Sequence, residues 1–352
     1  MDKKKKKALL AIAVATGSIT TAAATAHIAI YDKIFQRYER PDYTITPGLI
    51  CIDRLNDNIT KEEISFYSDD VLLKGNYYTC NNPKGIVIIA HGIHSGGDDY
   101  LSFIRYFIKN DFNVFSFNYK GTYDSKGDST VGFCEALVDL DHAIDYILSE
   151  EKFNNLPLFL FGHSWGGYAV CAVLSLQDKI NACASVAGMN NGFTIISEKA
   201  DQYAGKIAAP SKPFFDIYQR FLFKDYVKYD AIKGINNSNI PIVLAHGVDD
   251  KLILFNKQSI ISCNNKFKNG NIKYYIGKGF QGDHTDILYS NKAIIYRKEL
   301  ESELKLLEMK KGSKLTYQEK QEFNQSIDHI RYSEINEELM QLVVDTFNSA
   351  LK

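Results

Sequence analysis

The sequence predicts an α/β protein with a doubly wound, mostly parallel sheet, a small helical cap and a C-terminal helical extension. Three observations favour this fold class: short apolar runs typical of β-strands recur along the chain, helical patterns separate most of them, and several runs are apolar throughout. Strands that alternate with helices form a parallel sheet with both faces covered, so these strands need not alternate polar and apolar residues. This domain is predicted over residues 60–300.

Seven strands are expected because each is a short run rich in apolar, aromatic or β-branched residues. They cover residues 71–78, 86–90, 113–119, 158–161, 182–187, 242–246 and 272–276. Residues 100–110 and 135–150 place apolar side chains at spacings of three and four, which predicts helices.

Two segments depart from the alternation of strands and helices. Residues 189–239 are rich in aromatic side chains and predict a cap of inserted helices over the sheet. The charged residues 301–352 predict a helical extension, in which Thr316 and Glu319 fit a capping box. An apolar stripe in the last helix, from Ile335 to Leu351, indicates that these helices pack on the domain.

The first segment, residues 1–34, has five lysines followed by an uncharged stretch at residues 8–30. This stretch exceeds the about 20 residues that cross a bilayer, and the lysines favour a cytoplasmic N-terminus. We therefore expect a transmembrane anchor with the catalytic domain outside the cytoplasm. Alternatively, Ala24-Thr25-Ala26 fits a signal-peptide cleavage site, which predicts a secreted protein. A cytoplasmic protein with a peripheral helix is the third possibility.

Composition excludes some function classes. The 352 residues carry a formal net charge of -1, and no nucleic-acid-binding motif is present, so no nucleic-acid partner is expected. The six cysteines form no CxxC pair, and His91-x-x-His94 lacks a third ligand, so no metal site is expected. The oligomeric state is left open.

The stretch Gly162-His-Ser164-Trp-Gly166 follows an apolar strand and precedes a helical pattern. In that setting Gly-x-Ser-x-Gly forms a nucleophile elbow, a strained turn that exposes the serine hydroxyl. Side chains at Gly162 and Gly166 would collide with the strand and the helix, so only small residues fit there. Ser164 is therefore the candidate nucleophile.

A serine hydroxyl needs a base that takes its proton. Of the eight histidines, His284 lies in a glycine-containing loop after the last predicted strand and is the candidate base. His91 and His246 lie at strand ends, where they are expected to brace loops. The acid that holds the imidazole is expected after residues 242–246, where Asp249 and Asp250 both remain possible.

The order Ser164, acid, His284 is that of the α/β-hydrolase fold, and the chain resembles this superfamily over residues 60–300. It looks most like the serine-aminopeptidase and monoacylglycerol-lipase-like groups and the bacterial membrane-anchored hydrolases. Four matching pieces carry the resemblance: IVIIAHGIHSGG, FNYKGTYDSKGDS, GHSWGG, and AHGVDDKLI with GDHTD. The family's HG-x-x-D pattern implies that Asp250 is the acid. The resemblance also implies an oxyanion hole formed by the backbone N–H groups of Ile93 and Trp165.

The chain departs from the family in one loop. Many relatives have an aspartate where this chain has Asn118, and Tyr123 replaces the second glycine of the DxxGxGxS pattern, while Ser125 is retained. This loop shapes the site without taking part in the chemistry, so the departure weakens the inference about the substrate.

The predicted function is that of a serine hydrolase that cleaves an ester or another acyl bond through an acyl-enzyme, without a cofactor or metal. A carboxylesterase or lipase-like enzyme acting on a small-molecule or lipid-like acyl substrate is the first choice. A serine peptidase is the alternative, and it would need a charged pocket for a peptide terminus. A non-catalytic exported binding protein is a third reading, although such a protein has no need of all three residues.

Overall fold

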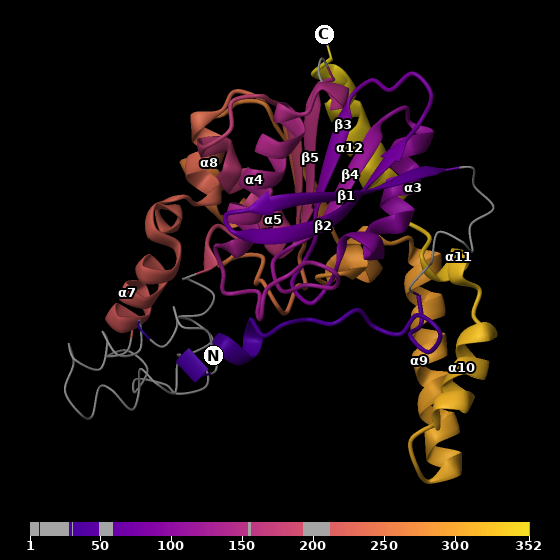
Figure 1. Ribbon diagram of the computed structural model, residues 1–352. Helices are drawn as coiled ribbons and strands as arrows, with labels where there is room; N and C mark the ends of the chain where they lie inside the picture. The colour runs from indigo at the N-terminus through magenta and orange to yellow at the C-terminus, as the bar shows by residue number, and fades with distance from the viewer. Residues whose placement is uncertain are drawn as a thin grey trace.

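The core of the structure, a computed structural model, is one eight-stranded sheet with the order β1–β2–β4–β3–β5–β6–β7–β8 (Figure 1). The structure describes residues 7, 28–29, 31–48, 59–153, 156–192 and 212–351. The strands are β1 (Thr60–Ser68), β2 (Val71–Thr79), β3 (Ile86–Ala90), β4 (Asn113–Asn118), β5 (Leu158–His163), β6 (Ile180–Val186), β7 (Ile242–Gly247) and β8 (Ile272–Gly277).

The sheet is mostly parallel, as predicted. All strands from β4 to β8 in the spatial order run parallel, and only β2 runs against its neighbours β1 and β4. The seven predicted strands are present. The eighth strand, β1, was not predicted. Its first four residues are exposed and polar or charged, and only Ile64, Phe66 and Ser68 toward its end are buried. An edge strand of this kind lacks the apolar run that predicts a buried strand.

The α-helices of the described residues are α3 (Leu101–Lys109), α4 (Glu135–Ser149), α5 (Trp165–Ala172), α7 (Lys212–Phe223), α8 (Ala231–Asn237), α9 (Asn291–Lys311), α10 (Tyr317–Gln325), α11 (His329–Tyr332) and α12 (Glu337–Ser349). Five of them, α3, α4, α5, α8 and α12, cover the two faces of the sheet. Side chains of α4, α5 and α8 share a core cluster with Ile86 and Ile88 of β3. Side chains of α3 and α12 share another with Val87 and Ile89. Because successive strand residues point to opposite faces, the two layers lie on opposite sides of the sheet.

Of the predicted cap at residues 189–239, the structure describes residues 189–192 and 212–239. Residues 193–211 lie outside the described residues. α8 belongs to the layer on the sheet, since a Cβ at Gly234 would overlap the carbonyl oxygen of Cys171 in α5. α7 stands away from the sheet at the lower left of Figure 1 and contacts the N-terminal segment, with the Tyr218 and Tyr31 rings 5.9 Å apart.

The predicted apolar stripe of the last helix is confirmed in α12. Leu339, Val343 and Phe347 are fully buried, and the Phe347 ring lies 4.9 Å from the Phe159 ring of β5. α12 therefore completes one face of the sheet.

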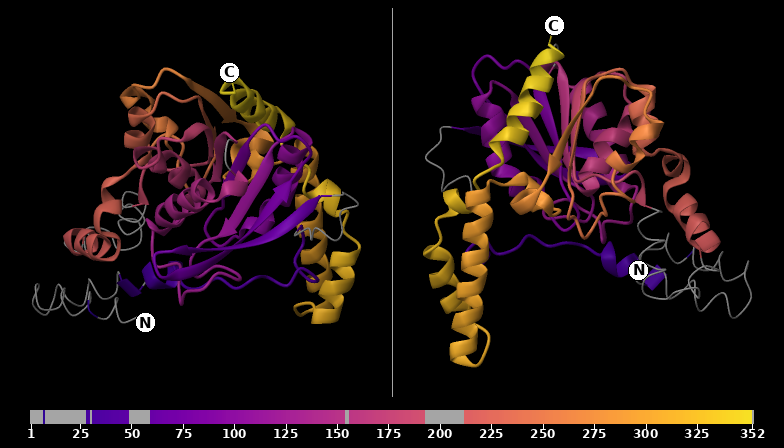
Figure 2. Two further views of the ribbon diagram at one scale, coloured as in Figure 1. Left: turned by 45° about the horizontal axis from the view of Figure 1, so that its top comes forward. Right: turned by 180° about the vertical axis from the view of Figure 1, so that it is seen from behind.

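α9 and α10 behave differently from α12, because they form a hairpin that projects from the body (Figure 2). The hairpin has a small core of its own, made by Leu300, Phe323 and Ile327. The predicted capping box of Thr316 and Glu319 is present at the start of α10. The predicted boundary between the sheet domain and the helical extension, after residue 300, falls inside α9, which begins at Asn291.

Residues 31–44, here called the strap, cross the carboxyl edge of the sheet. The Tyr38 N–H donates to the carbonyl oxygen of Gly121 (2.9 Å), and the Thr130 N–H donates to that of Phe35 (2.9 Å). Gly121 and Thr130 both lie in the loop after β4. At the far end, the Asn324 side chain of α10 donates to the Tyr43 carbonyl oxygen (2.9 Å). The strap therefore runs from α7 to α10 beneath the loops that follow the strands.

The prediction of a transmembrane helix is contradicted. In the part of the chain that the structure describes, no helix is both long and apolar enough to cross a membrane. Most of the predicted segment, residues 8–27 and Ile30, lies outside the described residues. At its end, Ile28 and Tyr31 are buried in the core cluster of the sheet domain. The predicted end of the N-terminal segment at residue 34 therefore falls inside the strap, which packs on the sheet domain.

Candidate active site

Ser164 forms the sharp turn between β5 and α5. β5 ends at His163 and α5 begins at Trp165. Ser164 has φ 56° and ψ −112°, a conformation that costs a non-glycine residue of the order of 1–3 kcal/mol and persists only where the surroundings enforce it. Its N–H donates to the Val186 carbonyl oxygen at 2.8 Å. The predicted strand–turn–helix geometry is therefore present.

The glycines of the motif allow this turn to close. A Cβ on Gly162 would overlap the carbonyl oxygen of Gly166, and a Cβ on Gly166 would overlap that of Ala90 at the end of β3. Both obstacles are backbone atoms, which cannot move aside as a flexible side chain can. The predicted requirement for small residues on both sides of Ser164 is confirmed.

The structure brings His284 and Asp250 to Ser164 from the loops after β8 and β7. His284 Nε2 lies 2.9 Å from Ser164 Oγ, and His284 Nδ1 lies 2.6 Å from Asp250 Oδ2. Because an ionised carboxylate only accepts, Nδ1 carries the proton and Nε2 is free to accept one from the hydroxyl. All three residues are nearly buried, with exposed fractions of 7% for Ser164, 6% for His284 and 2% for Asp250.

The Asp250 carboxylate has four hydrogen-bond donors. Oδ1 accepts the backbone N–H groups of Leu252 and Ile253, each at 2.8 Å. Oδ2 accepts from His284 and also lies 3.0 Å from His246 Nε2. Burial by itself would raise the pKa of Asp250, but the hydrogen bonds from His246 and His284 hold this pKa well below its usual value. The acid is therefore ionised at neutral pH.

Asp249, the other candidate acid, does not face His284. Its N–H donates to the Gly282 carbonyl oxygen at 2.8 Å, and its carboxylate packs against the Gly282 Cα, where a Cβ would lie 2.5 Å from Oδ2. Asp250 is thus the residue that the HG-x-x-D pattern selects and that the fold presents to the imidazole.

His246 is a further residue of the site, whereas the sequence predicts only that it lies at a strand end and braces a loop. Its Nε2 lies 2.8 Å from the Ile253 carbonyl oxygen and 3.0 Å from Asp250 Oδ2. Both of these atoms only accept, so Nε2 must carry a proton. The predicted bracing role is confirmed by the contact with Ile253, and the contact with Asp250 is new. His246 is the first residue of the HG-x-x-D stretch that ends at Asp250, and this was the signal available in the sequence.

Two other buried histidines are held away from Ser164 by their own partners. His91 Nδ1 donates to the Gly92 carbonyl oxygen (2.7 Å), and its Nε2 accepts the Tyr119 N–H (3.2 Å); burial lowers the pKa of His91 to about 4. His163 faces the Tyr100 hydroxyl at 3.0 Å. Burial, together with the nearby His284, lowers the pKa of His163 to about 3. Both rings are neutral at neutral pH.

The His91-x-x-His94 pair does not converge on one point. His94 Nε2 lies 2.9 Å from the Ile34 carbonyl oxygen in the strap, whereas His91 bonds within the core. Across the described ranges, no group of three or more His, Cys, Asp or Glu side chains is arranged to hold a metal ion.

The loop after β3 passes directly beside the elbow. A Cβ on Gly92 would lie 3.5 Å from Ser164 Cβ, and Ile93 is the next residue along this loop. Trp165 is the first residue of α5, where backbone N–H groups lack partners within the helix. The segments that carry the two expected oxyanion donors, Ile93 and Trp165, therefore both border the serine.

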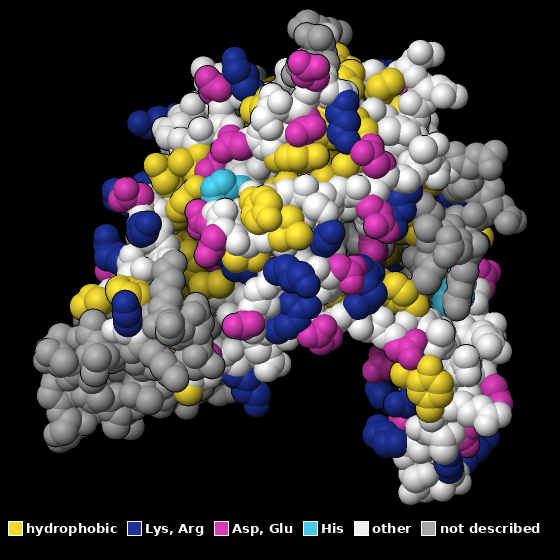
Figure 3. Space-filling view, viewed as in Figure 1, with side chains coloured by type: hydrophobic (Ala, Val, Ile, Leu, Met, Phe, Trp, Pro, Cys, Tyr) yellow, Lys and Arg dark blue, Asp and Glu magenta, His cyan; other side chains and the backbone are white. Residues whose placement is uncertain are grey.

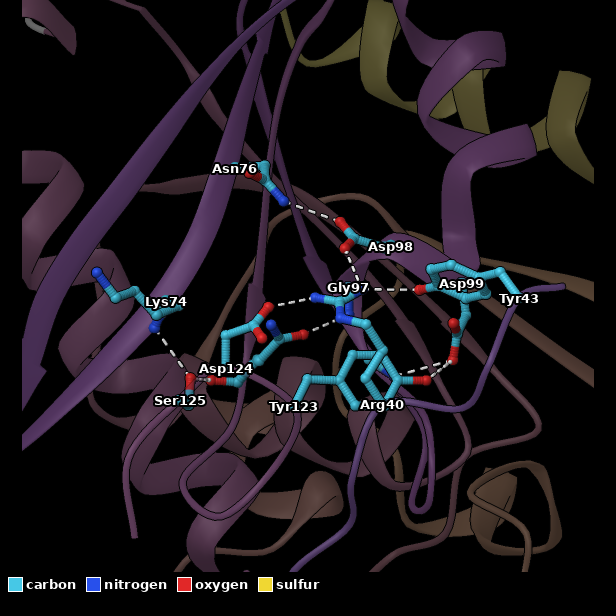
Figure 4. Close-up of polar contacts among 12 residues, drawn as sticks. Arg40, Tyr43, Lys74, Asn76, Gly97, Asp98, Asp99, Tyr123, Asp124 and Ser125 are labelled. Atoms are coloured by element: carbon cyan, nitrogen blue, oxygen red, sulfur yellow. Dashed lines mark hydrogen bonds and ion pairs between the residues drawn. The ribbon is translucent and has the colours of Figure 1, made fainter. Parts of the chain in front are cut away.

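The departures from the family pattern are accommodated in this loop region (Figure 4). Asn118 Oδ1 accepts the Gly97 N–H at 2.9 Å. The Tyr123 hydroxyl donates to Asp99 Oδ2 at 2.7 Å, and its ring covers Gly96, where a Cβ would collide with it. Asn118 and Tyr123 thus anchor the loop that continues from Ile93.

Arg40 of the strap joins the same network (Figure 4). Its guanidinium contacts Asp98 Oδ2 (2.7 Å) and Asp124, and Asp98 accepts from the Asn76 side chain at 2.8 Å. A cavity of about 370 Å³ lies beside it, lined by charged side chains of both signs, including Lys61 of β1. No residue of the Ser164 site lines this cavity.

The strap also supports the elbow from below. The Phe35 ring lies 5.7 Å from the Trp165 ring. The Trp165 indole N–H donates to the Phe133 carbonyl oxygen (2.6 Å), and the Phe133 N–H donates to the Tyr31 hydroxyl (2.6 Å). The sequence does not predict this role, because residues up to 34 are expected to form a membrane anchor or signal peptide. The aromatic residues at 31, 35 and 38 nevertheless follow the spacing of a buried helical face.

Comparisons with known proteins concern the family and the fold. Residues 81–216 match a protein family described as serine aminopeptidase, S33. The lysophosphatidylserine lipase ABHD12 of Xenopus tropicalis is 27% identical over 178 residues, which are 48% of this chain and 44% of the lipase. The chain spans about half the length of the curated relatives it matches.

Solved structures share the fold. An esterase of Pyrococcus furiosus, Pf2001, superposes with a TM-score of 0.53 at 16% identity over 78% of this chain and 98% of the esterase. An acylaminoacyl peptidase of Pyrococcus horikoshii superposes with a TM-score of 0.50 at 16% identity over 67% of this chain and 39% of the peptidase. At such identities the likeness concerns the fold alone.

Proposed function

The chain is a member of the α/β-hydrolase superfamily, and from this premise we propose that it is a serine hydrolase that cleaves carboxylic esters. The observation that supports the proposal most strongly is the continuous chain of contacts from Ser164 through His284 to Asp250. A turn that only connected a strand to a helix would require neither the imidazole nor the buried carboxylate.

The proposed reaction is acyl transfer to water. Ser164 Oγ attacks the carbonyl carbon while His284 Nε2 takes the hydroxyl proton. The leaving alcohol receives that proton from His284, and an acyl-enzyme remains on Ser164. A water molecule, deprotonated by His284, then attacks the acyl-enzyme, and release of the acid restores the serine. Asp250 stabilises the imidazolium that forms in each half-reaction and keeps the proton on Nδ1.

The tetrahedral intermediates carry a negative charge on the former carbonyl oxygen. We propose that the backbone N–H groups of Ile93 and Trp165 bind this oxyanion, and such donors contribute about 3–4 kcal/mol of transition-state stabilisation each. The hydrogen bonds of Asn118 and Tyr123 to the loop of Ile93 support this role. They hold the loop rigid before the charge develops, so that no reorganisation is needed during the reaction.

A lipid-like ester is the proposed substrate class. The similarity to lysophosphatidylserine lipases supports an acyl ester of a polar lipid. Peptidase activity is the second candidate, because the matching family is described as a serine aminopeptidase. The ratio of kcat/KM for a nitrophenyl ester to that for an aminoacyl anilide separates the two, and the proposal expects the ester to be preferred.

Labelling with a fluorophosphonate tests the proposal directly. The reagent reacts only with a serine whose hydroxyl is activated by a base. We expect the full chain to be labelled on the peptide that contains Ser164, with the site identified by mass spectrometry. Labelling should disappear in Ser164→Ala and in His284→Ala. A folded protein that stays unlabelled, or one labelled at another serine, would refute the proposal.

His246 is expected to act as a positioning residue for Asp250. His246→Phe keeps a ring but removes the N–H that faces Asp250 and Ile253. A hydrogen bond to a charged group contributes about 1.5–3 kcal/mol, so kcat should fall by about 10- to 100-fold while KM changes little. Steady-state kinetics on a soluble ester give both constants.

His246→Gln is the matched control, because its amide can still donate toward Asp250 and should recover part of the lost kcat. A loss that appears in KM, or an equal loss in both variants, would show that His246 acts only by filling space in the core.

A further inference from the structure

The free end of the α9–α10 hairpin exposes large apolar side chains. This hairpin tip, residues 305–317, has exposed fractions of 55% at Leu306, 39% at Leu307, 76% at Met309 and 56% at Tyr317. Single exposed apolar residues are common on soluble proteins, but a group at the end of a projecting arm marks an interaction site. The base of the hairpin, in contrast, is packed around its own small core.

The hairpin tip is also positively charged. Between residues 305 and 320 the sequence has five lysines and two glutamates, a formal charge of +3 in a chain of net charge -1. Both glutamates are paired within the same region, Glu308 with Lys314 and Glu319 with Lys311. Lys305 also pairs with Glu301 at the edge of this stretch. The net positive charge lies beside the exposed leucines and methionine, and blue, magenta and yellow side chains adjoin on the arm in Figure 3.

The hairpin projects on the side of the molecule where the carboxyl ends of the parallel strands lie (Figure 1). α9 has 21 residues, which corresponds to a length of about 30 Å. The strap, which crosses the carboxyl edge, contacts the start of α10 where the Tyr317 hydroxyl donates to Asp42 at 2.8 Å. Both views in Figure 2 show the arm leaving the body on this side, and Figure 3 shows the molecule hollowed between the arm and the body.

Other elements on the same side add exposed apolar residues. Ile217 and Phe221 of α7 are 50% and 39% exposed, and Ile34 of the strap is 37% exposed. α7 lies across the carboxyl edge from the hairpin (Figure 1). The candidate active site is thus flanked by two projecting elements that both present apolar side chains.

We propose that the hairpin tip docks on the surface of an anionic lipid bilayer, without crossing it, and thereby turns the carboxyl edge of the sheet toward the lipid. Leu306, Leu307 and Met309 would enter the boundary between headgroups and acyl chains, while the lysines contact phosphates through their long stems. A convex tip with three exposed aliphatic side chains suits a lipid surface better than a protein partner, which buries about 800 Å² per side in a stable complex. The benefit for a lipid substrate rests on the proposed function, but the docking does not.

Tryptophan fluorescence tests the contact. Met309→Trp in the full chain places an indole at the tip, and Leu148→Trp places one at an exposed position (41%) at the far end of α4, near the amino ends of the strands. The native Trp165 is buried in both proteins. With vesicles of equal parts phosphatidylglycerol and brominated phosphatidylcholine, we expect the emission of Met309→Trp to be strongly quenched and that of Leu148→Trp to be unchanged. Equal behaviour of the two proteins would overturn the proposal.

Charge reversal tests the role of the lysines. The variant with Lys310, Lys311 and Lys314 changed to Glu should bind these vesicles at least tenfold more weakly, and the difference should shrink at high salt. The matched control changes Lys84, Lys109 and Lys152 to Glu at the opposite edge of the sheet. All proteins retain the N-terminal segment, so any difference between them comes from the tip. Equal vesicle binding by the two triple variants would contradict the proposal.

Two readouts distinguish the alternatives. If the tip covers a second copy of the chain, the tip variant will change the oligomeric state in sedimentation without lipid, and the docking proposal fails. Hydrolysis of a soluble short-chain ester should be the same in both triple variants, whereas hydrolysis of a lysophospholipid in vesicles should fall only in the tip variant. A wild-type protein that cleaves neither substrate refutes the proposed function, and the quenching result still decides the docking.

Discussion

Ser164→Ala should reduce kcat/KM for a soluble nitrophenyl ester by about 10⁵-fold. The alanine cannot form an acyl-enzyme, so the acyl group has no covalent attachment, and water must attack without a nucleophile bound to the protein. A small residual rate is expected, because the backbone N–H groups of Ile93 and Trp165 can still stabilise the oxyanion when water attacks directly. Initial rates measured over a range of ester concentrations give the loss.

The control for this variant is Ser149→Ala, which removes an exposed hydroxyl at the end of α4 and should leave kcat/KM unchanged. Circular dichroism and thermal unfolding should show that Ser164→Ala is folded. Its Tm should not fall, because within the described residues the hydroxyl hydrogen-bonds only to His284. Retention of more than a few per cent of the wild-type rate would exclude Ser164 as the nucleophile.

Asp250→Asn should reduce kcat by about 10³- to 10⁴-fold. An amide cannot replace a carboxylate that accepts from four donors. If the Asn oxygen faces His284, its NH₂ meets the N–H groups of Leu252 and Ile253. If the NH₂ faces His284, the imidazole must place its proton on Nε2, which then cannot accept the proton of Ser164. The first orientation sets donor against donor, and the second leaves His284 in the wrong tautomer, so KM should change far less than kcat.

Asp249→Asn is the matched control, since the same chemical change is made one residue away. Asp249 contacts Gly282 and not the imidazole, so this variant should keep most of the wild-type kcat. A reversed order, with the larger loss in Asp249→Asn, would refute the assignment of the acid. The pKa of Asp250 is held well below its usual value, so the comparison is valid at any pH near neutrality.

Local patterns explain why most of the sheet and the candidate residues could be predicted. A buried parallel strand is an apolar run whichever partner it pairs with, so seven strands were visible in the sequence. The elbow is likewise local, because the constraints on Gly162 and Gly166 come from atoms within a few residues of Ser164 or from the adjacent strand β3. The chain order of nucleophile, acid and base then identified His284 and left Asp249 and Asp250 as candidate acids, between which the resemblance to the family's HG-x-x-D pattern implied Asp250.

Elements whose role depends on distant contacts were missed or misread. β1 has few apolar residues and is recognised only by its pairing with β2. The end of the expected membrane segment has the composition of an anchor, yet Ile28 and Tyr31 pack into the core of the domain. Composition reports that a side chain avoids water, but it does not report whether protein or lipid covers it.

The sequence by itself thus determined the fold class, the order of strands along the chain and the candidate residues Ser164, Asp250 and His284, because periodicity and short motifs encode these features locally. Only the tertiary structure decided that His246 shares the Asp250 carboxylate, that the strap supports the elbow and that the α9–α10 hairpin projects beside the carboxyl edge. These are contacts between segments far apart in the chain, and their free energy appears only when folding removes the intervening water and fixes both partners.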